Sequence, residues 1–592
     1  MTKLVAIVFF IVLASGCGTA PSEQLARLSE EFVYTTLSFS PGTATGLGLH
    51  RYKKQNLDDL LDDVSMGSLD KQKLFYQNFQ KRLAALKTDR LTPEELADLN
   101  ILQDQTELAL LDFNRIQTAL HNPTFYVETL GNALFSPYVL EYAPLKARIQ
   151  NIIARLQKVP LYLDLASSNI VSAPAVWTQV SMEENQGNIN LVDKTIRAAV
   201  PDDLRETYAQ AARPALDAMK KFQDYLKVTL SNRNTADWRL GQENYTRKFQ
   251  YSLESGRDAA AGGMAADTAL QLAETELSKV RAHMLELALP LHRKIASGHG
   301  DHNDLTGDAR QNKVIGEVLA EIAKRHSTRE SYMEDARKDL DEARAFVEEK
   351  HLLTLPSRSN LQVIPTPEFM RGIYSVGGFN AAPALEPQLG AFYWVTPIPP
   401  DWPAERVESK LREYNFYKLK LLTIHEAMPG HYVQMEFANG VEPASRRVLR
   451  SVYGSGPYIE GWGQYSTQVM LDEGFLNHSP ELALTFAKEE LRVIANAILD
   501  VRLQMLNMTD QEAMNLMEQQ TFQEEEEASG KLQRAKLSSC QLPMYFLGWR
   551  GWLRVRDAYK RKKGASYRLA EFHDSALKEG AVPLPVLERL LQ

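Results

Sequence analysis

The stretch Thr423–Gln434, TIHEAMPGHYVQ, contains two histidines and a glutamate in a pattern typical of metal-dependent hydrolases. Neutral imidazoles are common zinc ligands, and a glutamate directly after one of them is placed to accept a proton from water. The pattern therefore indicates His425 and His431 as metal ligands and Glu426 as a general base.

The spacing of the two histidines departs from the usual helical pattern, in which four residues separate them and both share one face. Here they are six residues apart, about 120° out of register on a regular helix. Pro429 and Gly430 lie between them, and both residue types interrupt helices. We predict a helix over about 406–439, broken at 428–430 so that His431 returns to His425. The alternative is a kinked core helix with two unrelated histidines.

A third ligand candidate, Glu460, lies in the sequence YIEGW, 35 residues after His425. Two histidines and a glutamate would leave one position of a tetrahedral zinc ion open for water. The sequence therefore predicts a zinc site made by His425, His431 and Glu460.

Four motifs resemble those of a large bacterial family of uncharacterised HExxPGH lipoproteins that look like zinc peptidases. They are HEAMPGHYVQ, YIEGW, QLPMYFLG and EFHDSALKEGAVPLPVLERLL, and the resemblance covers nearly the whole mature chain, most densely from about residue 390. That family is distantly similar to the helical neurolysin, angiotensin-converting-enzyme and thermostable-carboxypeptidase groups. The resemblance implies a mainly α, elongated, two-lobed fold with a deep channel and a small β-sheet beside the metal helix.

The resemblance also implies an activity, namely zinc-dependent hydrolysis of short peptides, with exopeptidase action of the carboxypeptidase or dipeptidase type. It implies Tyr545, with His573 as a second candidate, as donors to the developing oxyanion, although each could instead belong to the core. Asp500 is expected to orient a zinc imidazole, or else to be a buried ion-pair partner. Thr467 and Gln504 depart from the family pattern, which leaves substrate preference open.

Two other functions stay compatible with these residues. One is a metal-free, lipid-anchored protein that binds peptides or acts as a scaffold. The other is a zinc hydrolase of a non-peptide amide. Zinc content separates the first from a peptidase, and the range of substrates separates the second.

The composition is that of a globular protein with a large core, since 44% of the 592 residues are apolar and 24% are charged. We expect one helical domain over residues 25–592, with an N-terminal lobe to about 358 and a metal-site lobe over 359–592. The net charge of −8 and the lack of a basic stripe argue against nucleic acid as a partner.

The N-terminus has the features of a lipoprotein signal peptide over residues 1–16. Lys3 precedes an apolar run over 4–13 that is too short to cross a bilayer, and Ala14–Cys17 resembles a lipobox. We expect lipidation at Cys17, a tether over 17–24, and an exported protein held at the outer membrane, facing the periplasm. A plain cleaved secretory signal is the alternative.

Helical periodicity continues from residue 24 to about 358, with a clear helix start at Thr92 and Pro93. Residues 361–365 and 391–395 are rich in β-forming types and are separated by a glycine-rich loop over 377–383. An exposed edge of this sheet could pair with an extended peptide, unless the sheet is a purely structural hairpin.

Three further features are interpreted as structural. Residues 299–304, with two histidines and two aspartates, are expected to form a polar loop. The run of four glutamates over 524–527 is expected to be a solvated stretch of helix. Cys540 is expected to be a buried thiol.

Overall fold

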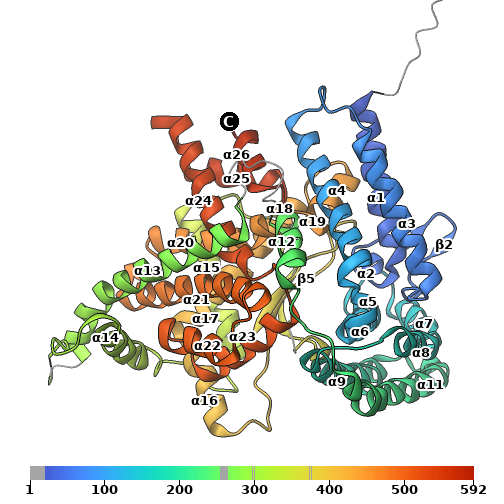
Figure 1. Ribbon diagram of the computed structural model, residues 1–592, viewed down its shortest axis with the longest axis horizontal. Coiled ribbons are helices and arrows are strands. Elements are labelled where there is room, and N and C mark those ends of the chain that lie inside the picture. Colours follow the sequence, from blue (N-terminus) through green and yellow to red (C-terminus); the bar gives the residue numbers. More distant parts are fainter. Residues whose placement is uncertain (1–19, 254–263, 296–297, 299, 372–373, 375) are drawn as a thin grey trace, which may run out of the picture.

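The computed structural model describes residues 20–253, 264–295, 298, 300–371, 374 and 376–592. It is mainly helical with a small sheet, which confirms the mainly α part of the predicted fold class, and its helices form two bodies that lie side by side (Figure 1). The predicted signal peptide and Cys17 lie outside the described residues. The predicted tether is too long, because a helix already begins at Pro21.

The first body contains the helices before residue 225 and a short β-hairpin. Its elements are α1 (Pro21–Phe39), α2 (Pro41–Gly46), β1 (Arg51–Tyr52), β2 (Gln55–Asn56), α3 (Met66–Ala84), α4 (Pro93–Leu111), α5 (Thr118–His121), α6 (Pro123–Val139), α7 (Leu145–Leu156), α8 (Val159–Asn169), α9 (Ala175–Asn190), α10 (Arg197–Ala199) and α11 (Arg205–Asp224). The expected start of α4 is confirmed, since Thr92 and Glu95 form a capping box.

The second body contains the remaining helices and surrounds the predicted metal site, although Val448 and Leu449 pack in a core with α1, α3 and α4 of the first body. Its helices are α12 (Gly241–Ser252), α13 (Ala266–Ile295), α14 (Gly307–Ile322), α15 (Tyr332–Lys350), α16 (Ala404–Glu413), α17 (Phe416–Glu426), α18 (His431–Ala438), α19 (Ala444–Val452), α20 (Gly456–Asp472), α21 (Pro480–Met505), α22 (Asp510–Asn515), α23 (Glu525–Leu537), α24 (Pro543–Lys563), α25 (Leu569–Lys578) and α26 (Leu584–Leu590).

Helix α13 packs against α21, and buried apolar residues of both belong to the largest core of the protein. The division between the two bodies therefore falls between α11 and α12, well before residue 358. Periodicity alone could not place this division, because both bodies are built from amphipathic helices of similar composition.

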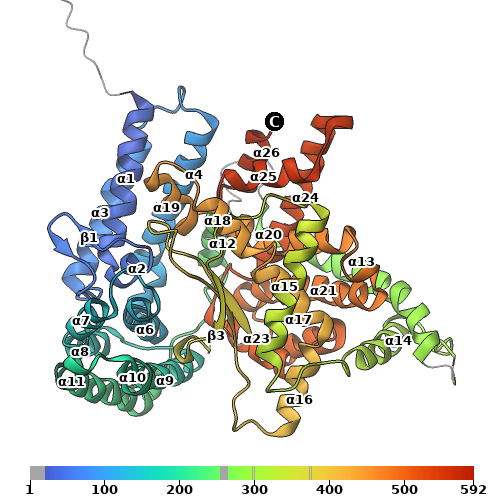
Figure 2. The ribbon, with the colours of Figure 1, turned by 180° about the vertical axis from the view of Figure 1, so that it is seen from behind.

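A three-stranded sheet lies between the two bodies (Figure 2). Its order is β3 (Leu361–Pro365), β5 (Ala391–Val395), β4 (Gly377–Asn380), with β3 parallel and β4 antiparallel to β5. Side chains of β5 alternate between two cores: Phe392 and Trp394 pack in the first body, whereas Tyr393 packs in the second. The sheet thus joins the bodies through a strand that is buried on both faces.

Strands β3 and β5 occupy the predicted residues, but the expectation of a loop at 377–383 is wrong for its first four residues. They form β4, and a Cβ atom on Gly377 would lie 2.5 Å from the Trp394 carbonyl oxygen. Glycine here permits close pairing of two strands. In the sequence alone, glycine in a strand cannot be distinguished from glycine in a loop, which is why a loop was expected.

Within the described part of the chain, no helix is both long enough and apolar enough to cross a membrane.

Helices α20 and α24 cross at a pair of glycines, and this crossing brings two of the sequence motifs together. A Cβ atom on Gly461 would lie 2.3 Å from the Gly548 carbonyl carbon, so the helix backbones are in direct contact there. Glu460 and Tyr545 are close neighbours of these glycines in sequence. The crossing therefore sets the distance between them.

We expect Gly461→Ala to destabilise the protein, because the new methyl group must separate α20 from α24. Overpacking of this kind costs about 1–3 kcal/mol. Gly316→Ala in α14 is the matched control, since a Cβ atom there meets nothing within 4 Å and alanine favours helices by about 0.5–1 kcal/mol. Denaturant unfolding should show a loss for the first variant and no loss for the second. Equal stability of both variants would contradict the close crossing.

Candidate metal centre

The predicted break in the helix is confirmed, since α17 ends at Glu426 and α18 begins at His431. The Gly430 N–H donates to the Ile424 carbonyl oxygen at 2.9 Å, which folds the chain back on itself. A Cβ atom on Gly430 would lie 1.9 Å from the His425 carbonyl oxygen, so only glycine fits this turn. The turn places the imidazole rings 4.7 Å apart between centroids.

A second break, at Tyr414 and Asn415, divides the predicted 406–439 helix again. The Asn415 side chain accepts hydrogen bonds from the Tyr417 and Lys418 N–H groups and so caps the start of α17. Asparagine at this position is a common helix start.

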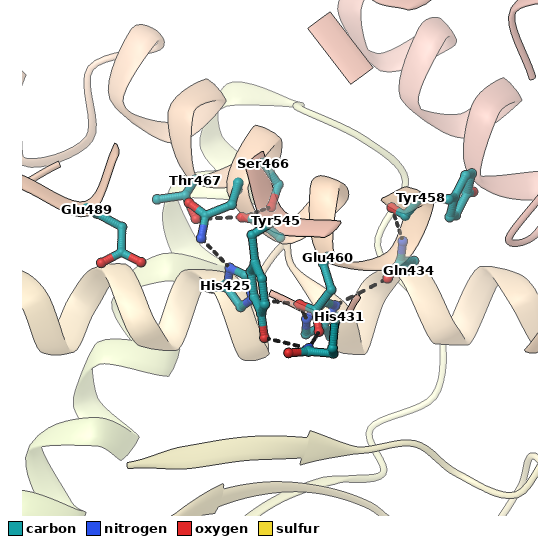
Figure 3. Close-up of polar contacts among 12 residues, drawn as sticks. His425, His431, Gln434, Tyr458, Glu460, Ser466, Thr467, Glu489 and Tyr545 are labelled. Carbon is teal, nitrogen blue, oxygen red and sulfur yellow. Dashed lines mark hydrogen bonds and ion pairs between the residues drawn. The ribbon is translucent and has the colours of Figure 1, made fainter. Parts of the chain in front are cut away.

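Glu460 on α20 faces both histidines (Figure 3). Its Oε2 atom lies 3.6 Å from His425 Nε2 and 3.5 Å from His431 Nε2, and the three atoms lie within 4.8 Å of one another. Ligands of a tetrahedral zinc ion, with bonds of about 2.0–2.2 Å, are separated by about 3.3–3.6 Å. The three residues therefore fit a zinc ion in both chemistry and spacing.

Each imidazole has a glutamine beside its Nδ1 atom. Gln434 Oε1 lies 3.3 Å from His431 Nδ1, whereas the Gln464 atom next to His425 Nδ1, at 3.5 Å, is the amide nitrogen Nε2. The oxygen beside His431 decides which ring nitrogen of that residue is free. A proton on Nδ1 bonded to an amide oxygen leaves Nε2 as the electron-pair donor that a metal needs. Helical spacing could have indicated both glutamines, because Gln434 follows His431 by three residues and Gln464 follows Glu460 by four.

The charge of Glu460 dominates the electrostatics of the three residues. Burial opposes its ionisation, but hydrogen bonds from His425 and His431 hold its pKa well below the usual range. In the opposite sense, burial lowers the pKa of His431, whereas Glu460 raises it more, to about 9. The pocket is thus strongly suited to positive charge.

Tyr545 on α24 stacks over His425, with ring centroids 6.1 Å apart and planes inclined by 23°. Its Oη atom accepts hydrogen bonds from Gln541 Nε2 at 3.2 Å and from Arg534 Nη2 at 3.3 Å. Burial, reinforced by the charge of Glu460, raises the pKa of Tyr545 to about 12. The phenol is therefore neutral at pH 7, and with two donors at its oxygen it can give its own proton to a third group.

Glu426 and Tyr545 line one cavity together with His425. Its empty volume, including the open mouth, is about 790 Å³. The charge of Glu426 contributes to the raised pKa values of His431 and Tyr545, so its carboxylate is close to both. Thr467 also lines this cavity, which places that departure from the family pattern in the wall next to the site.

His573 is not brought into this cavity. Its Nδ1 atom donates to the Leu352 carbonyl oxygen at 2.7 Å, and its Nε2 atom pairs with Tyr465 Oη at 2.9 Å. Burial lowers its pKa to about 4, so the ring is neutral. The side chain packs against Trp462, in the core beside the candidate site. This position corrects the expected role of His573 as an oxyanion donor.

Asp500 is buried but contacts neither imidazole, so the expected orienting role is wrong, and its partners are neutral groups, not the cation that the alternative of an ion pair requires. Its Oδ2 atom accepts from Tyr245 Oη at 2.6 Å and from the Cys540 N–H at 2.7 Å. Burial raises its pKa to about 6. Gln504 similarly bonds the Leu240 N–H and the Ser538 carbonyl oxygen. The Cys540 thiol is buried and free, as expected.

A second group of histidines forms where the sequence indicated only a polar loop. His302 and His292 both bond Glu317 Oε2, at 3.0 and 2.8 Å. Lys313 lies 3.0 Å from the other oxygen of this carboxylate. Because one carboxylate already bonds all three side chains, we interpret the group as a link between α13 and α14. His299 lies outside the described residues.

The glutamate run over 524–527 is also not a uniformly solvated stretch. Glu527 is buried and pairs with Arg492 at 2.6 Å. Glu524 and Glu526 pair with arginines of α16. The expectation failed because charge content alone does not reveal cations from distant helices.

Comparisons with known proteins show relatives of the same fold, and none of their descriptions names an activity. The model of a family described as "Bacterial protein of unknown function (DUF885)" matches residues 41–591. A candidate lipoprotein of unknown function from Shewanella oneidensis is 27% identical, with a TM-score of 0.75 over 96% of this chain and 99% of its own. One from Colwellia psychrerythraea is 18% identical, with a TM-score of 0.76 over 97% and 99%. No curated protein matches.

We expect about one zinc ion per chain, held by His425, His431 and Glu460. His431→Ala should lose most of this zinc, because a tetrahedral ion would keep only two protein ligands. His302→Ala is the matched control, since it removes a histidine from the other cluster. Elemental analysis after dialysis against zinc measures both. Full zinc content in His431→Ala, or loss of zinc in His302→Ala, would show that the metal lies elsewhere.

Proposed function

Since this chain belongs to the DUF885 family, whose description assigns no function, we propose its activity from the site itself: metal-dependent hydrolysis of peptide bonds in short peptides. The observation that carries this proposal is the convergence of a zinc-type ligand set, a carboxylate base and a neutral phenol donor at one cavity. These are the groups that amide hydrolysis needs.

Each residue has a separate role in this proposal. His425, His431 and Glu460 would hold a zinc ion, which would supply the Lewis acidity that polarises a carbonyl group and lowers the pKa of a water molecule. Glu426 accepts the proton of the attacking water and delivers it to the leaving amine. Tyr545 donates its hydroxyl proton in a hydrogen bond to the carbonyl oxygen as negative charge develops there.

The position of the small sheet supports a peptide substrate. Gly377, the first residue of β4, lines the cavity together with the metal ligand His425. Strand β4 is at an edge of the sheet, because β5 pairs with only one of its sides. An edge strand offers backbone donors and acceptors to an extended peptide. We therefore propose that the substrate backbone lies along β4.

We also propose that the protein is exported and anchored to a membrane by a lipid on Cys17. The lipobox-like sequence before Cys17 and the similarity to structures described as candidate lipoproteins support this. Anchoring would keep the hydrolase at a membrane surface while its cavity stays in the aqueous compartment.

Glu426→Gln tests the proposed base. The amide keeps the size of the side chain but cannot accept the proton, and loss of a general base costs about 10²–10⁴-fold in rate. We expect kcat on a mixed peptide library to fall by this factor while zinc content is unchanged. Glu442→Gln, at an exposed side chain, should leave both unchanged. A fully active Glu426→Gln protein would remove this mechanism.

Tyr545→Phe tests the proposed oxyanion donor, because it removes only the hydroxyl group. Loss of one such donor costs about 10²–10³-fold, mainly in kcat. The control is Tyr453→Phe, whose hydroxyl bonds Thr36 in the first body. We expect peptidase assays to show the loss for Tyr545→Phe alone. Unchanged kcat would assign the donor role to another group.

A further inference from the structure

The cavity beside the candidate metal centre contains more buried cations than carboxylates. Apart from Glu426, which has a catalytic role in the proposed function, two carboxylates and four cations line it. The carboxylates are Glu489 and Glu527, and the cations are Lys418, Arg492, Lys531 and Arg534.

Two of these cations are neutralised within the wall of the cavity. Glu489 contacts Lys418 and lies 3.1 Å from Arg492. Arg492 also lies 2.6 Å from Glu527, which accepts a further hydrogen bond from Tyr414 Oη at 3.0 Å. Both carboxylates are therefore already engaged with Lys418 and Arg492.

The other two cations, Lys531 and Arg534, have no carboxylate oxygen within 4.0 Å among the described residues. Lys531 is only 5% exposed. Arg534 donates to neutral oxygens, namely Gln541 Oε1 at 3.1 Å and Tyr545 Oη at 3.3 Å. They stand three residues apart on α23 and so occupy the same side of the helix. A buried charge without a counter-ion is unfavourable, so a site that keeps two of them is suited to an anion.

We propose that Lys531 and Arg534 bind the free C-terminal carboxylate of a peptide, which makes the protein a carboxypeptidase if the proposed peptide hydrolysis is correct. A guanidinium and an ammonium together match a carboxylate in charge and hydrogen-bonding capacity.

The position of the two cations sets the length of the released fragment. Arg534 bonds Tyr545, the proposed donor at the scissile carbonyl. Lys531 is three residues away, so the Cβ atoms of the two cations are about 5–6 Å apart on one face of α23, and one extended peptide residue spans about 3.6 Å. A carboxylate held between them is one or two residues from the bond that is cut.

The protonation of Lys531 is consistent with such a ligand. Burial, reinforced by the nearby charge of Arg492, holds the pKa of Lys531 well below its usual range. A carboxylate bound beside it would favour the charged ammonium again. Binding would then replace an unfavourable isolated cation with an ion pair.

The experiment compares three peptides that differ only at the C-terminus. The first ends in alanine with a free carboxylate, the second ends in alanine amide, and the third ends in glutamate amide. We expect kcat/KM for the free acid to exceed that for either amide by about 10–100-fold, the effect of one charge-assisted hydrogen bond or ion pair in a buried site. Preference for glutamate amide would assign the cations to an acidic side chain and overturn the proposal.

Lys531→Met tests the assignment within the protein. It should reduce the preference for the free acid about 10–100-fold, through KM, and leave the amides unaffected. Lys536→Met on the same helix is the matched control, since Lys536 pairs with Asp510 outside the cavity. Removal of an uncompensated buried charge should not lower stability, so thermal unfolding of Lys531→Met should match the wild type. An unchanged acid preference in folded Lys531→Met would overturn the assignment.

Binding to the Glu426→Gln protein separates this proposal from the proposed function. Fluorescence anisotropy of labelled peptides measures affinity without any hydrolysis. Tighter binding of the free acid than of the amide supports the carboxylate site even if the wild type cleaves neither peptide, a result that would reject the peptidase activity alone. Equal affinity for acid and amide would overturn the carboxylate site, whatever the activity.

Discussion

The indole N–H of Trp462 bonds the carbonyl oxygens of Pro429 and Gly430, at 2.9 and 3.2 Å, and the candidate site depends on this contact. The broken turn between α17 and α18 leaves the Pro429 carbonyl group without a helical partner, while the Gly430 carbonyl group accepts the first hydrogen bond of α18 from the Gln434 N–H at 3.1 Å. Both carbonyl groups lie in a buried place, where unpaired polar groups are costly. Trp462 satisfies them from α20, two residues after Glu460. The same contact thus stabilises the turn that pairs the histidines and fixes the helix that brings the third ligand.

Close packing of α20 against α17 also supports the arrangement of the three candidate ligands. A Cβ atom on Gly463 would lie 2.5 Å from the His425 ring, so α20 can approach α17 only because that residue is glycine. Gln541 then joins two helices, because its side-chain amide donates to Glu460 Oε1 and to Tyr545 Oη. The candidate ligand Glu460 and the proposed oxyanion donor Tyr545 are thereby both held by the side chain of Gln541. In the proposed hydrolase, such outer contacts would fix the orientation of the candidate catalytic groups before a substrate arrives.

The hydrogen-bond network of the candidate site continues into the cavity wall, where several buried charged side chains lie. Arg534 bonds Gln541 and Tyr545, so the polar contacts of the metal centre extend directly into α23. Farther along the wall, Arg492 is shared by Glu489 and Glu527. Internal pairs of this kind contribute little to net stability, since desolvation offsets most of the attraction. Within the wall these pairs neutralise Lys418 and Arg492, and they leave Lys531 and Arg534 for the proposed anion.

The sequence by itself determined the local features of this protein. The helical fold class, the capping box at Thr92, strands β3 and β5, and the break at Pro429 and Gly430 all follow from residue type and short-range spacing. The three candidate ligands could also be chosen, because each lies in a short motif whose chemistry is evident from a few adjacent residues.

Only the tertiary structure decided which distant side chains complete the site. Asp500 and His573 have suitable chemistry, yet packing assigns them to Tyr245 and Leu352, whereas glutamines contact the imidazoles. The same holds for buried charge. Whether the glutamates over 524–527 or Lys531 have counter-ions depends on which distant helices pack beside them, and the sequence alone does not show this. Local patterns specify elements, but partners across a core depend on how those elements pack, which short-range spacing does not encode.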